Sequence, residues 1–211
     1  DRALGYEANY AGTSFLTTDK LGKFEFGSKM VNMIADKTQE NGMATCGYDD
    51  DGVKTTRWHL VKDGTFVDYQ TTRDQAHLIG QKESRGCSYA DSWASIPFQR
   101  MPNVSLEPGA KDISEADIIA ATDDGVYVKG DASYSIDHQR YNFQFSGQTF
   151  WEVKNGKVTT QLRDLDYGDV LFHFFQDDYF ESIVRLEANR DFGRLQHHAG
   201  EAELLSGGLY L

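Results

Sequence analysis

Six histidines and two cysteines are the side chains of this 211-residue chain that could hold a transition metal or act as nucleophiles. The histidines are His59, His77, His138, His173, His197 and His198. None belongs to an H-E-x-x-H motif, in which one helix face presents two metal ligands and a general base. His197 and Glu201 are four residues apart and could bridge a metal, but we favour a solvated helix face for this pair. A metal site built from His173, His197, His198 and acidic residues of the tail is kept as an alternative.

The two cysteines, Cys46 and Cys87, are interpreted as buried thiols rather than as nucleophiles or metal ligands. They lie 41 residues apart, and neither has a C-x-x-C partner. Residues 1–12, DRALGYEANYAG, show no basic segment followed by an apolar run, so no signal peptide is visible. Two thiols without a secretory signal favour a reduced, cytoplasmic protein.

Acidic residues outnumber basic ones, and the formal net charge is −12. This excess argues against nucleic acid and against an anionic membrane surface as partners, because both call for a basic patch. The segment DDDG at 49–52 lacks the glutamate that a calcium loop needs, so we interpret it as an acidic turn before a strand. The sequence contains no phosphate loop, dinucleotide fingerprint or G-x-S-x-G elbow. A catalytic centre is therefore not indicated by any of these motifs.

The elements that must position any site are mostly strands, because apolar and polar residues alternate between turn signals over much of 43–162. We expect a hairpin over 53–70 with Asp63-Gly64 as its turn, and a second hairpin turning at Asn155-Gly156. Strands are expected at 43–48, 125–130, 132–136, 140–147, 148–153 and 157–162.

Helical signals are few and short. Ser114 and Asp117 form a capping box that predicts a helix from 115 onwards, and Gly125 is expected to end it. Residues 71–80 predict a second short helix with Gly80 as its stop. The expected fold class is therefore α+β, mostly antiparallel β-sheet with a few short helices at its edges.

All three prolines of the chain, Pro97, Pro102 and Pro108, lie within twelve residues. Because proline fixes φ and lacks a backbone N–H, this stretch should be extended without being a central strand. Such a segment is either a plain loop or an edge with which another chain can pair.

An ordered set of segments carries a resemblance to a known family. The set comprises GYEANYAGTSFL near the N-terminus, Asp50 to Gly52, Gly64 to Tyr69, Tyr89-Ala90, and PFQRMPN from Pro97 to Asn103. In this order the segments resemble the C-terminal part of the TldD/PmbA family, cytoplasmic zinc metallopeptidases that are also described as modulators of DNA gyrase. The resemblance covers about residues 1–163. Residues 164–211 are a divergent tail that could belong to the same domain, and an amphipathic helix is expected in it over 179–195.

The resemblance implies a zinc-dependent peptide hydrolase, but the family's zinc ligands have no counterpart in this sequence. In the family, a helix bearing H-E-x-x-x-H supplies two ligands and the general base, just before the segment that residues 1–12 resemble. A cysteine near the C-terminus supplies the third ligand, and this sequence has no cysteine after Cys87. Because a zinc peptidase needs three protein ligands, we expect this chain alone to bind no zinc and to hydrolyse no peptide.

The resemblance also places the proline-rich stretch beside the substrate cleft. An extended strand there could pair with the backbone of a peptide substrate. The candidate substrate-binding residues are Tyr89, Arg100 and Asn103. Arg100 could meet a carboxylate or carbonyl of the peptide, and Asn103 could fix its backbone. The alternative is that Arg100 and Asn103 brace a loop and that Tyr89 belongs to the core.

The leading hypothesis is that this chain forms the substrate-side β scaffold of a peptide cleft in a TldD/PmbA-like peptidase, which another polypeptide completes. The first alternative is a non-catalytic peptide-binding or partner subunit, since members of the family pair as homo- or hetero-oligomers. The second is a β-rich structural module with no ligand.

Overall fold

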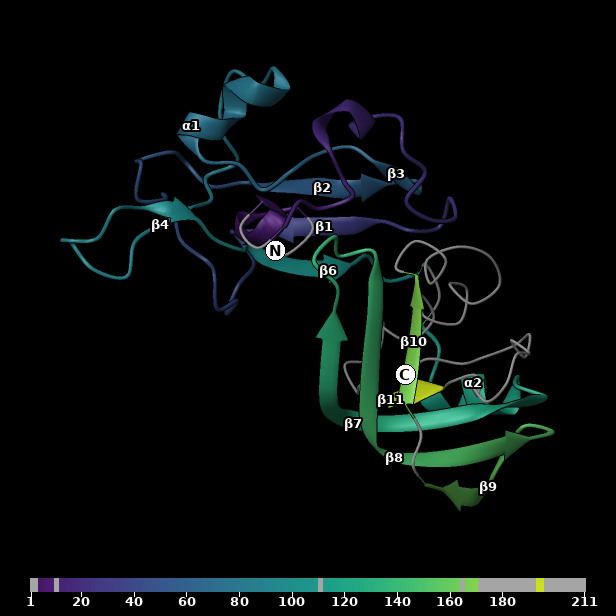
Figure 1. Ribbon diagram of the computed structural model, residues 1–211. Helices are drawn as coiled ribbons and strands as arrows, with labels where there is room; N and C mark the ends of the chain where they lie inside the picture. The colour runs from purple at the N-terminus through teal and green to yellow at the C-terminus, as the bar shows by residue number, and fades with distance from the viewer. Residues whose placement is uncertain (1–3, 10–11, 110–111, 164–165, 171–192, 196–211) are drawn as a thin grey trace. The chain divides into compact units, whose positions relative to one another are not determined.

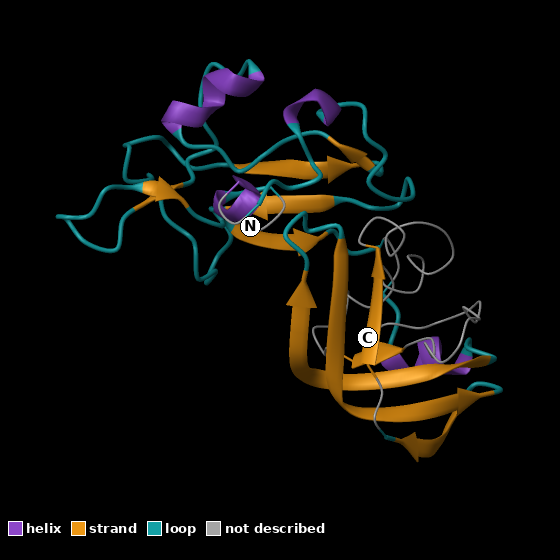
Figure 2. Cartoon of the chain, in the orientation of Figure 1, coloured by secondary structure: helices purple, strands orange, loops and turns teal. Residues whose placement is uncertain are grey.

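Antiparallel strands make up most of the structure, a computed structural model that describes residues 4–9, 12–109, 112–163, 166–170 and 193–195 (Figures 1 and 2). The fold class is α+β, as predicted. The chain divides into two units that alternate along the sequence. Unit 1 comprises Asp1–Glu25, Asn32–Leu106 and His138–Arg140, and unit 2 comprises Phe26–Val31, Glu107–Asp137 and Tyr141–Leu211.

Unit 1 is built on a four-stranded antiparallel sheet in the order β3-β2-β1-β6. Its strands are β1 (Met33–Asp36), β2 (Arg57–Lys62), β3 (Thr65–Phe66) and β6 (Asn103–Leu106). β2 and β3 form the predicted hairpin, in which Asp63 and Gly64 have φ of 47° and 76°, as a type I′ turn requires. Leu60, Val61 and Phe66 of this hairpin are buried, which fixes its register against the core.

Unit 1 also contains a two-stranded ribbon, β4 (Ser88–Tyr89) and β5 (Phe98–Gln99). The predicted helix over 71–80 is present as α1 (Arg73–Ala76), followed by the 3₁₀ turn η3 (His77–Ile79). It ends at Gly80, whose φ of 73° confirms the predicted left-handed stop. Two further 3₁₀ turns, η1 (Tyr6–Asn9) and η2 (Thr18–Lys20), precede the sheet.

Unit 2 is built on a five-stranded antiparallel sheet in the order β10-β8-β7-β11, with β9 also paired to β8. Its strands are β7 (Asp124–Ile136), β8 (Asn142–Lys154), β9 (Lys157–Leu162), β10 (Asp166–Val170) and β11 (Gly193–Leu195). Each long strand merges two of the predicted ones, and Figure 1 shows β7 and β8 bending together. The register shifts between Asp131 and Tyr134, which is the bulge that such a bend needs.

The second predicted hairpin and the capped helix are confirmed in unit 2. Asn155 and Gly156 turn β8 into β9 at φ of 49° and 74°. Helix α2 (Glu115–Ala120) begins after Ser114, whose Oγ accepts from the N–H of Asp117 at 3.2 Å. The carboxylate of Asp117 in turn accepts from the N–H of Ser114 at 3.0 Å.

Two expectations were wrong, and a third is contradicted only at the three of its residues that the structure describes. Residues 43–48 form turns rather than a strand, apart from a single bridge between Tyr48 and Lys54. Helix α2 ends at Ala121, and Gly125 instead pairs with Val153 within β7. Of the tail helix expected over 179–195, residues 179–192 lie outside the described residues, and Gly193–Leu195 is strand β11. Among the described residues, no helix has the length and hydropathy that a membrane span requires.

Candidate functional site

The β4–β5 ribbon exposes its aromatic side chains and buries its polar ones. Tyr89 and Phe98 face each other across the two strands and are 47% and 42% exposed. Ser88 and Gln99 also face each other and are 3% and 2% exposed. Opposite residues of an antiparallel pair lie on the same face, so the ribbon has one open aromatic face and one buried polar face. This inversion of the usual pattern leaves aromatic surface available to a partner.

Exposed apolar side chains continue along the chain on both sides of β5. Trp93 and Ile96, in the loop between β4 and β5, are 99% and 84% exposed. Met101 and Val104, which follow β5, are also exposed. Aromatic side chains and methionine are enriched in protein interfaces, and tryptophan and tyrosine are frequent among the side chains that contribute most of the binding energy.

The proline-rich stretch is extended, and its strands are not central, as predicted. Pro102 separates β5 from β6, and β6 is an edge strand of the unit 1 sheet. At the opposite edge of the sheet, the N–H of Phe66 in β3 donates to the carbonyl of Phe24 at 2.9 Å. The segment around Phe24 therefore covers the outer edge of β3. In the described part of the chain, β1 is the one strand that pairs with β6. Residues 103–106 carry no charge and no proline that would block an added strand.

The acidic segment 49–52 is a turn, as predicted. The N–H of Asp49 donates to the carbonyl of Val53 at 3.0 Å, and Gly52 has a φ of 74°. The carboxylate of Asp49 accepts from the N–H of Asp51 at 3.1 Å and of Val53 at 2.8 Å, so it satisfies backbone donors. This role explains an aspartate there without a bound cation.

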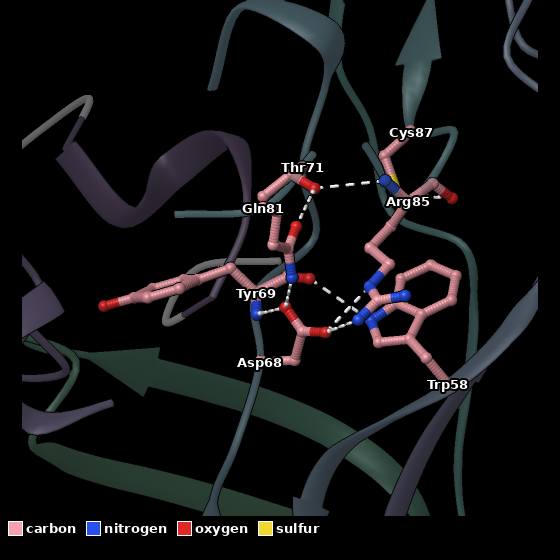
Figure 3. Close-up of polar contacts among 7 residues, drawn as sticks. All are labelled: Trp58, Asp68, Tyr69, Thr71, Gln81, Arg85 and Cys87. Atoms are coloured by element: carbon pink, nitrogen blue, oxygen red, sulfur yellow. Dashed lines mark hydrogen bonds and ion pairs between the residues drawn. The ribbon is translucent and has the colours of Figure 1, made fainter. Parts of the chain in front are cut away.

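An ion pair between the half-buried Arg85 and the buried Asp68 supports the segments that flank the ribbon (Figure 3). Arg85 donates from Nε and Nη2 to Asp68 Oδ2, at 2.7 and 2.6 Å. Asp68 Oδ1 accepts from Gln81 Nε2 at 2.6 Å and from the N–H of Tyr69 at 2.8 Å. Thr71 joins both sides, because its Oγ1 donates to Gln81 Oε1 at 3.2 Å and accepts from the N–H of Arg85 at 3.1 Å. The network ties the segment after β3 to the chain that enters β4.

Cys87 lies next to this network, and its thiol is expected to be unreactive. Its N–H donates to the carbonyl of Thr71 at 3.2 Å, and its side chain is fully buried. Burial raises the pKa of the Cys87 thiol to about 12, so the thiolate does not form near neutral pH. Both cysteines are free thiols, and the interpretation of Cys87 as a buried thiol is confirmed, whereas Cys46 is half-buried.

The three candidate substrate-binding residues occupy two elements. Tyr89 lies on the open face of the ribbon, so the alternative that it belongs to the core is wrong. Arg100 directly follows β5 and is exposed, and its N–H donates to the carbonyl of Cys87 at 2.8 Å. Asn103 begins β6. The role of all three toward a peptide stays a prediction.

The side chain of Asn103 braces the loop after β1. Its Oδ1 accepts from the N–H of Ala44 at 3.0 Å, and its Nδ2 donates to the carbonyl of Asp36 at 2.8 Å and to Thr45 Oγ1 at 3.0 Å. A Cβ on Gly42 would lie 2.4 Å from this Nδ2, so a larger residue there would displace the Asn103 side chain. These contacts match the alternative of a loop brace.

The donor set of the described residues does not fit a zinc site. In that part of the chain, no group of three histidine, cysteine, aspartate or glutamate side chains could hold a metal ion. A protein zinc site needs three such ligands or more. His173, His197 and His198, which the alternative tail site requires, lie outside the described residues.

Known proteins resemble this chain over most of its length. Residues 2–180 match the family model of the PmbA/TldA metallopeptidase C-terminal domain. A metalloprotease of Methanocaldococcus jannaschii is 30% identical over 166 residues, which are 76% of this chain and 35% of that protein. A zinc metalloprotease TldD homolog of Saccharolobus solfataricus is 26% identical over 122 residues, or 56% of this chain and 26% of that protein.

The fold is also found among solved structures. The crystal structure of TldE from Thermococcus kodakarensis superimposes with a TM-score of 0.62 at 22% identity, covering 74% of this chain and 35% of that one. The chain therefore spans about a third of the length of the Methanocaldococcus jannaschii metalloprotease and of TldE. The family match extends past the predicted end of the family-like region at 163, and the division into 1–163 and 164–211 stays a prediction.

Proposed function

This chain belongs to the PmbA/TldA metallopeptidase family as its C-terminal domain, and from that premise we propose that it forms the substrate-side scaffold of a peptide-binding site. The substrate is an extended peptide, which adds as a strand to the free edge of β6. The open face of the β4–β5 ribbon contacts the side chains of that peptide. Hydrolysis requires zinc ligands that the described residues do not supply.

The observation that carries this proposal is the combination of an open sheet edge with exposed aromatic side chains in one stretch, 89–106. Strand addition draws its affinity from main-chain hydrogen bonds, which β6 can offer along one side. It draws its selectivity from the side-chain contacts alongside, which Tyr89, Phe98 and Val104 can offer. A soluble module without a ligand would not be expected to gather both features in one segment.

Arg100 extends the chemistry of the same stretch. It directly follows β5 and is exposed, and a guanidinium can donate to a carboxylate or to carbonyl oxygens of a peptide. The peptide that fits best is therefore extended and rich in β-branched or aromatic residues, and it carries an acceptor group opposite Arg100.

Binding of a designed peptide tests this proposal. The probe is a fluorescein-labelled peptide of about ten residues that alternates valine and threonine, long enough to pair along β6 and pass the ribbon. We expect saturable binding by fluorescence polarisation, with a Kd on the order of 100 µM, since a short strand pairing gives modest affinity. A version with proline at adjacent central positions loses N–H donors on both of its edges, so in no register can those positions donate to β6, and it should not bind.

Variants locate the site. Ser105→Lys places a charge on the free edge of β6 and should weaken binding at least about fivefold. Thr160→Lys makes the same change on an exposed residue of β9, in unit 2, and should leave the Kd unchanged. Equal effects of the two variants, or binding of the proline-substituted peptide, would show that the peptide does not pair with β6.

A second candidate function, a partner subunit for a metal-bearing chain, rests on the donor set of the described residues, which cannot hold zinc. Zinc content measured by mass spectrometry tests this second idea. Zinc that appears only after mixing with a polypeptide bearing the family's metal helix supports a shared catalytic site. Stoichiometric zinc on this chain alone would contradict both ideas and would point to ligands outside the described residues.

A further inference from the structure

Strand β4 is hydrogen-bonded on both of its edges, although β5 is the one strand that pairs with it among the described residues. On the first edge it pairs with β5, and the carbonyl of Cys87 accepts from the N–H of Arg100. On the second edge, both backbone groups of Ser88 bond to the acidic turn. Its N–H donates to Asp49 Oδ2 at 3.1 Å, and its carbonyl accepts from the N–H of Asp50 at 3.3 Å.

The bond that completes this second edge comes from Asp50. The N–H of Ala90 donates to Asp50 Oδ2 at 2.6 Å. Ser88 and Ala90 are two residues apart, so their backbone groups point to the same side of the strand. The acidic turn therefore takes the place of a third strand, with carboxylate oxygens standing where carbonyl oxygens of a strand would be.

The carboxylates of Asp49 and Asp50 differ in burial and in the groups that they bind. Asp49 is buried, and its Oδ1 also holds the turn itself through the N–H groups of Asp51 and Val53. Asp50 is exposed, and the side-chain hydrogen bond that the structure describes for it comes from the N–H of Ala90, the residue directly after β4. Changing Asp49 would disrupt the turn, whereas changing the side chain of Asp50 would chiefly free the N–H of Ala90, directly after β4, and leave both bonds to Ser88 in place.

Tyr89 lies between the two residues that the acidic turn holds. The bonds to Ser88 and Ala90 fix the backbone on either side of Tyr89 and thereby set the direction in which its ring leaves the strand. They also occupy backbone groups on the second edge of β4, so a peptide cannot add as a strand there. The free edge of β6 remains for strand addition.

We propose that Asp50 is a positioning residue for the peptide-binding face, and this inference rests on the proposed function. Asp50 acts through the N–H of Ala90 and does not itself contact the peptide. It keeps the Tyr89 ring beside Phe98 on the open face of the ribbon. It also occupies the N–H of Ala90, so that a peptide cannot pair as a strand on that side.

Three variants of the full 211-residue chain test this role with the valine–threonine peptide as probe. Asp50→Ala removes the acceptor, and we expect the Kd to rise about five- to tenfold, as loss of one charge-assisted hydrogen bond implies. Asp50→Asn keeps an acceptor oxygen at the same place and should restore most of the affinity. Asp51→Ala removes a neighbouring charge from the same turn and should leave the Kd within about twofold of wild type, because the hydrogen bonds that the structure describes for Asp51 use its backbone.

Amide hydrogen exchange gives a second readout that peptide binding does not enter. In the wild-type chain the Ala90 amide should exchange about as slowly as the Ser88 amide. In Asp50→Ala it should exchange at least about tenfold faster, while the Leu60 amide of β2 is unchanged. The wild-type comparison remains decisive even where Asp50→Ala fails to fold, because a fast Ala90 amide in the wild type would overturn the proposal.

The outcomes distinguish the positioning role of Asp50 from the binding of the peptide itself. Faster exchange at Ala90 with an unchanged Kd would overturn the positioning role and leave the proposed function standing. A wild-type chain that does not bind the peptide would refute the proposed function, and the positioning role with it. Equal loss of affinity in Asp50→Ala and Asp50→Asn would mean that the charge acts on the peptide directly, which also contradicts the proposal.

Discussion

Replacing Arg85 by alanine should destabilise unit 1 far more than its surface position suggests. The Asp68 side chain is 6% exposed and that of Arg85 is 35% exposed, and two short contacts join them. Breaking a buried ion pair on one side costs roughly 3–5 kcal/mol, because a charge is left buried without its partner. Here water can reach the Arg85 end, and Asp68 keeps donors from Gln81 and Tyr69. We therefore expect Arg85→Ala to lower the free energy of unfolding by about 2 kcal/mol.

The assay is urea unfolding followed by tryptophan fluorescence, to which the buried Trp58 contributes. Lys82→Ala is the matched control, since it removes an exposed cation three residues away and should cost less than about 0.5 kcal/mol. Asp68→Asn alone and combined with Arg85→Ala completes a double-mutant cycle, whose coupling should be at least about 1 kcal/mol. It should persist in about 1 M salt, because a largely buried pair is poorly screened.

A small effect would refute this reasoning. If Arg85→Ala lowers the free energy of unfolding no more than Lys82→Ala does, water replaces the ion pair without loss and the pair does not stabilise unit 1. A coupling that vanishes in high salt would mean that the pair behaves as an exposed one, with the value of about 0–1 kcal/mol that such pairs have.

Three further predictions concern the turns and the thiols. Gly156→Ala should lower the free energy of unfolding by more than about 1 kcal/mol, since its φ is 74° and a Cβ would lie 2.7 Å from the carbonyl of Ala120. Gly22→Ala, with a φ of 72° but open space, should cost less in the same urea experiment. A maleimide at neutral pH should label the half-buried Cys46 well before Cys87, as peptide mapping would show, and faster labelling of Cys87 would contradict its burial. Because burial raises the folded pKa of Cys87 to about 12, the unfolded chain loses this proton first, and stability should fall as pH rises from about 9 towards 12.

The elements that the sequence predicted correctly are those whose signal is local. Asp63-Gly64 and Asn155-Gly156 adopt positive φ because their own chemistry allows it, and the strands on either side follow from the turn. Ser114 and Asp117 lie three residues apart and cap each other without help from the rest of the chain. Such features depend on a few neighbouring residues, so a single sequence is enough to reveal them.

The expectations that were wrong depended on partners elsewhere in the chain. Gly125 has the chemistry of a helix stop, but pairing with Val153 of β8 draws it into a strand instead. Residues 43–48 alternate like a strand, yet the sheet places β6 beside β1 and leaves that segment as turns.

The candidate site was predicted only in part. The proline pattern marked the stretch that contains the free edge, and Tyr89 is exposed there. The role of Asp50 had no signal in the sequence, because its partner Ala90 is 40 residues away. The pairing of Asp68 with Arg85 also joins residues too far apart for any local pattern to indicate.

The alternation of the two units along the sequence constrains how the protein can be made. Unit 1 receives its last segment, His138–Arg140, only after Glu107–Asp137 of unit 2 has been synthesised. That segment is integral, because the carbonyl of Gln139 accepts from the N–H of Phe15 at 2.9 Å and Arg140 donates to the carbonyl of Gly12 at 3.2 Å. On the ribosome, unit 1 therefore cannot close as a finished body before Arg140 has emerged. A truncation between Leu106 and His138 removes the last segment of unit 1 and therefore does not isolate that unit.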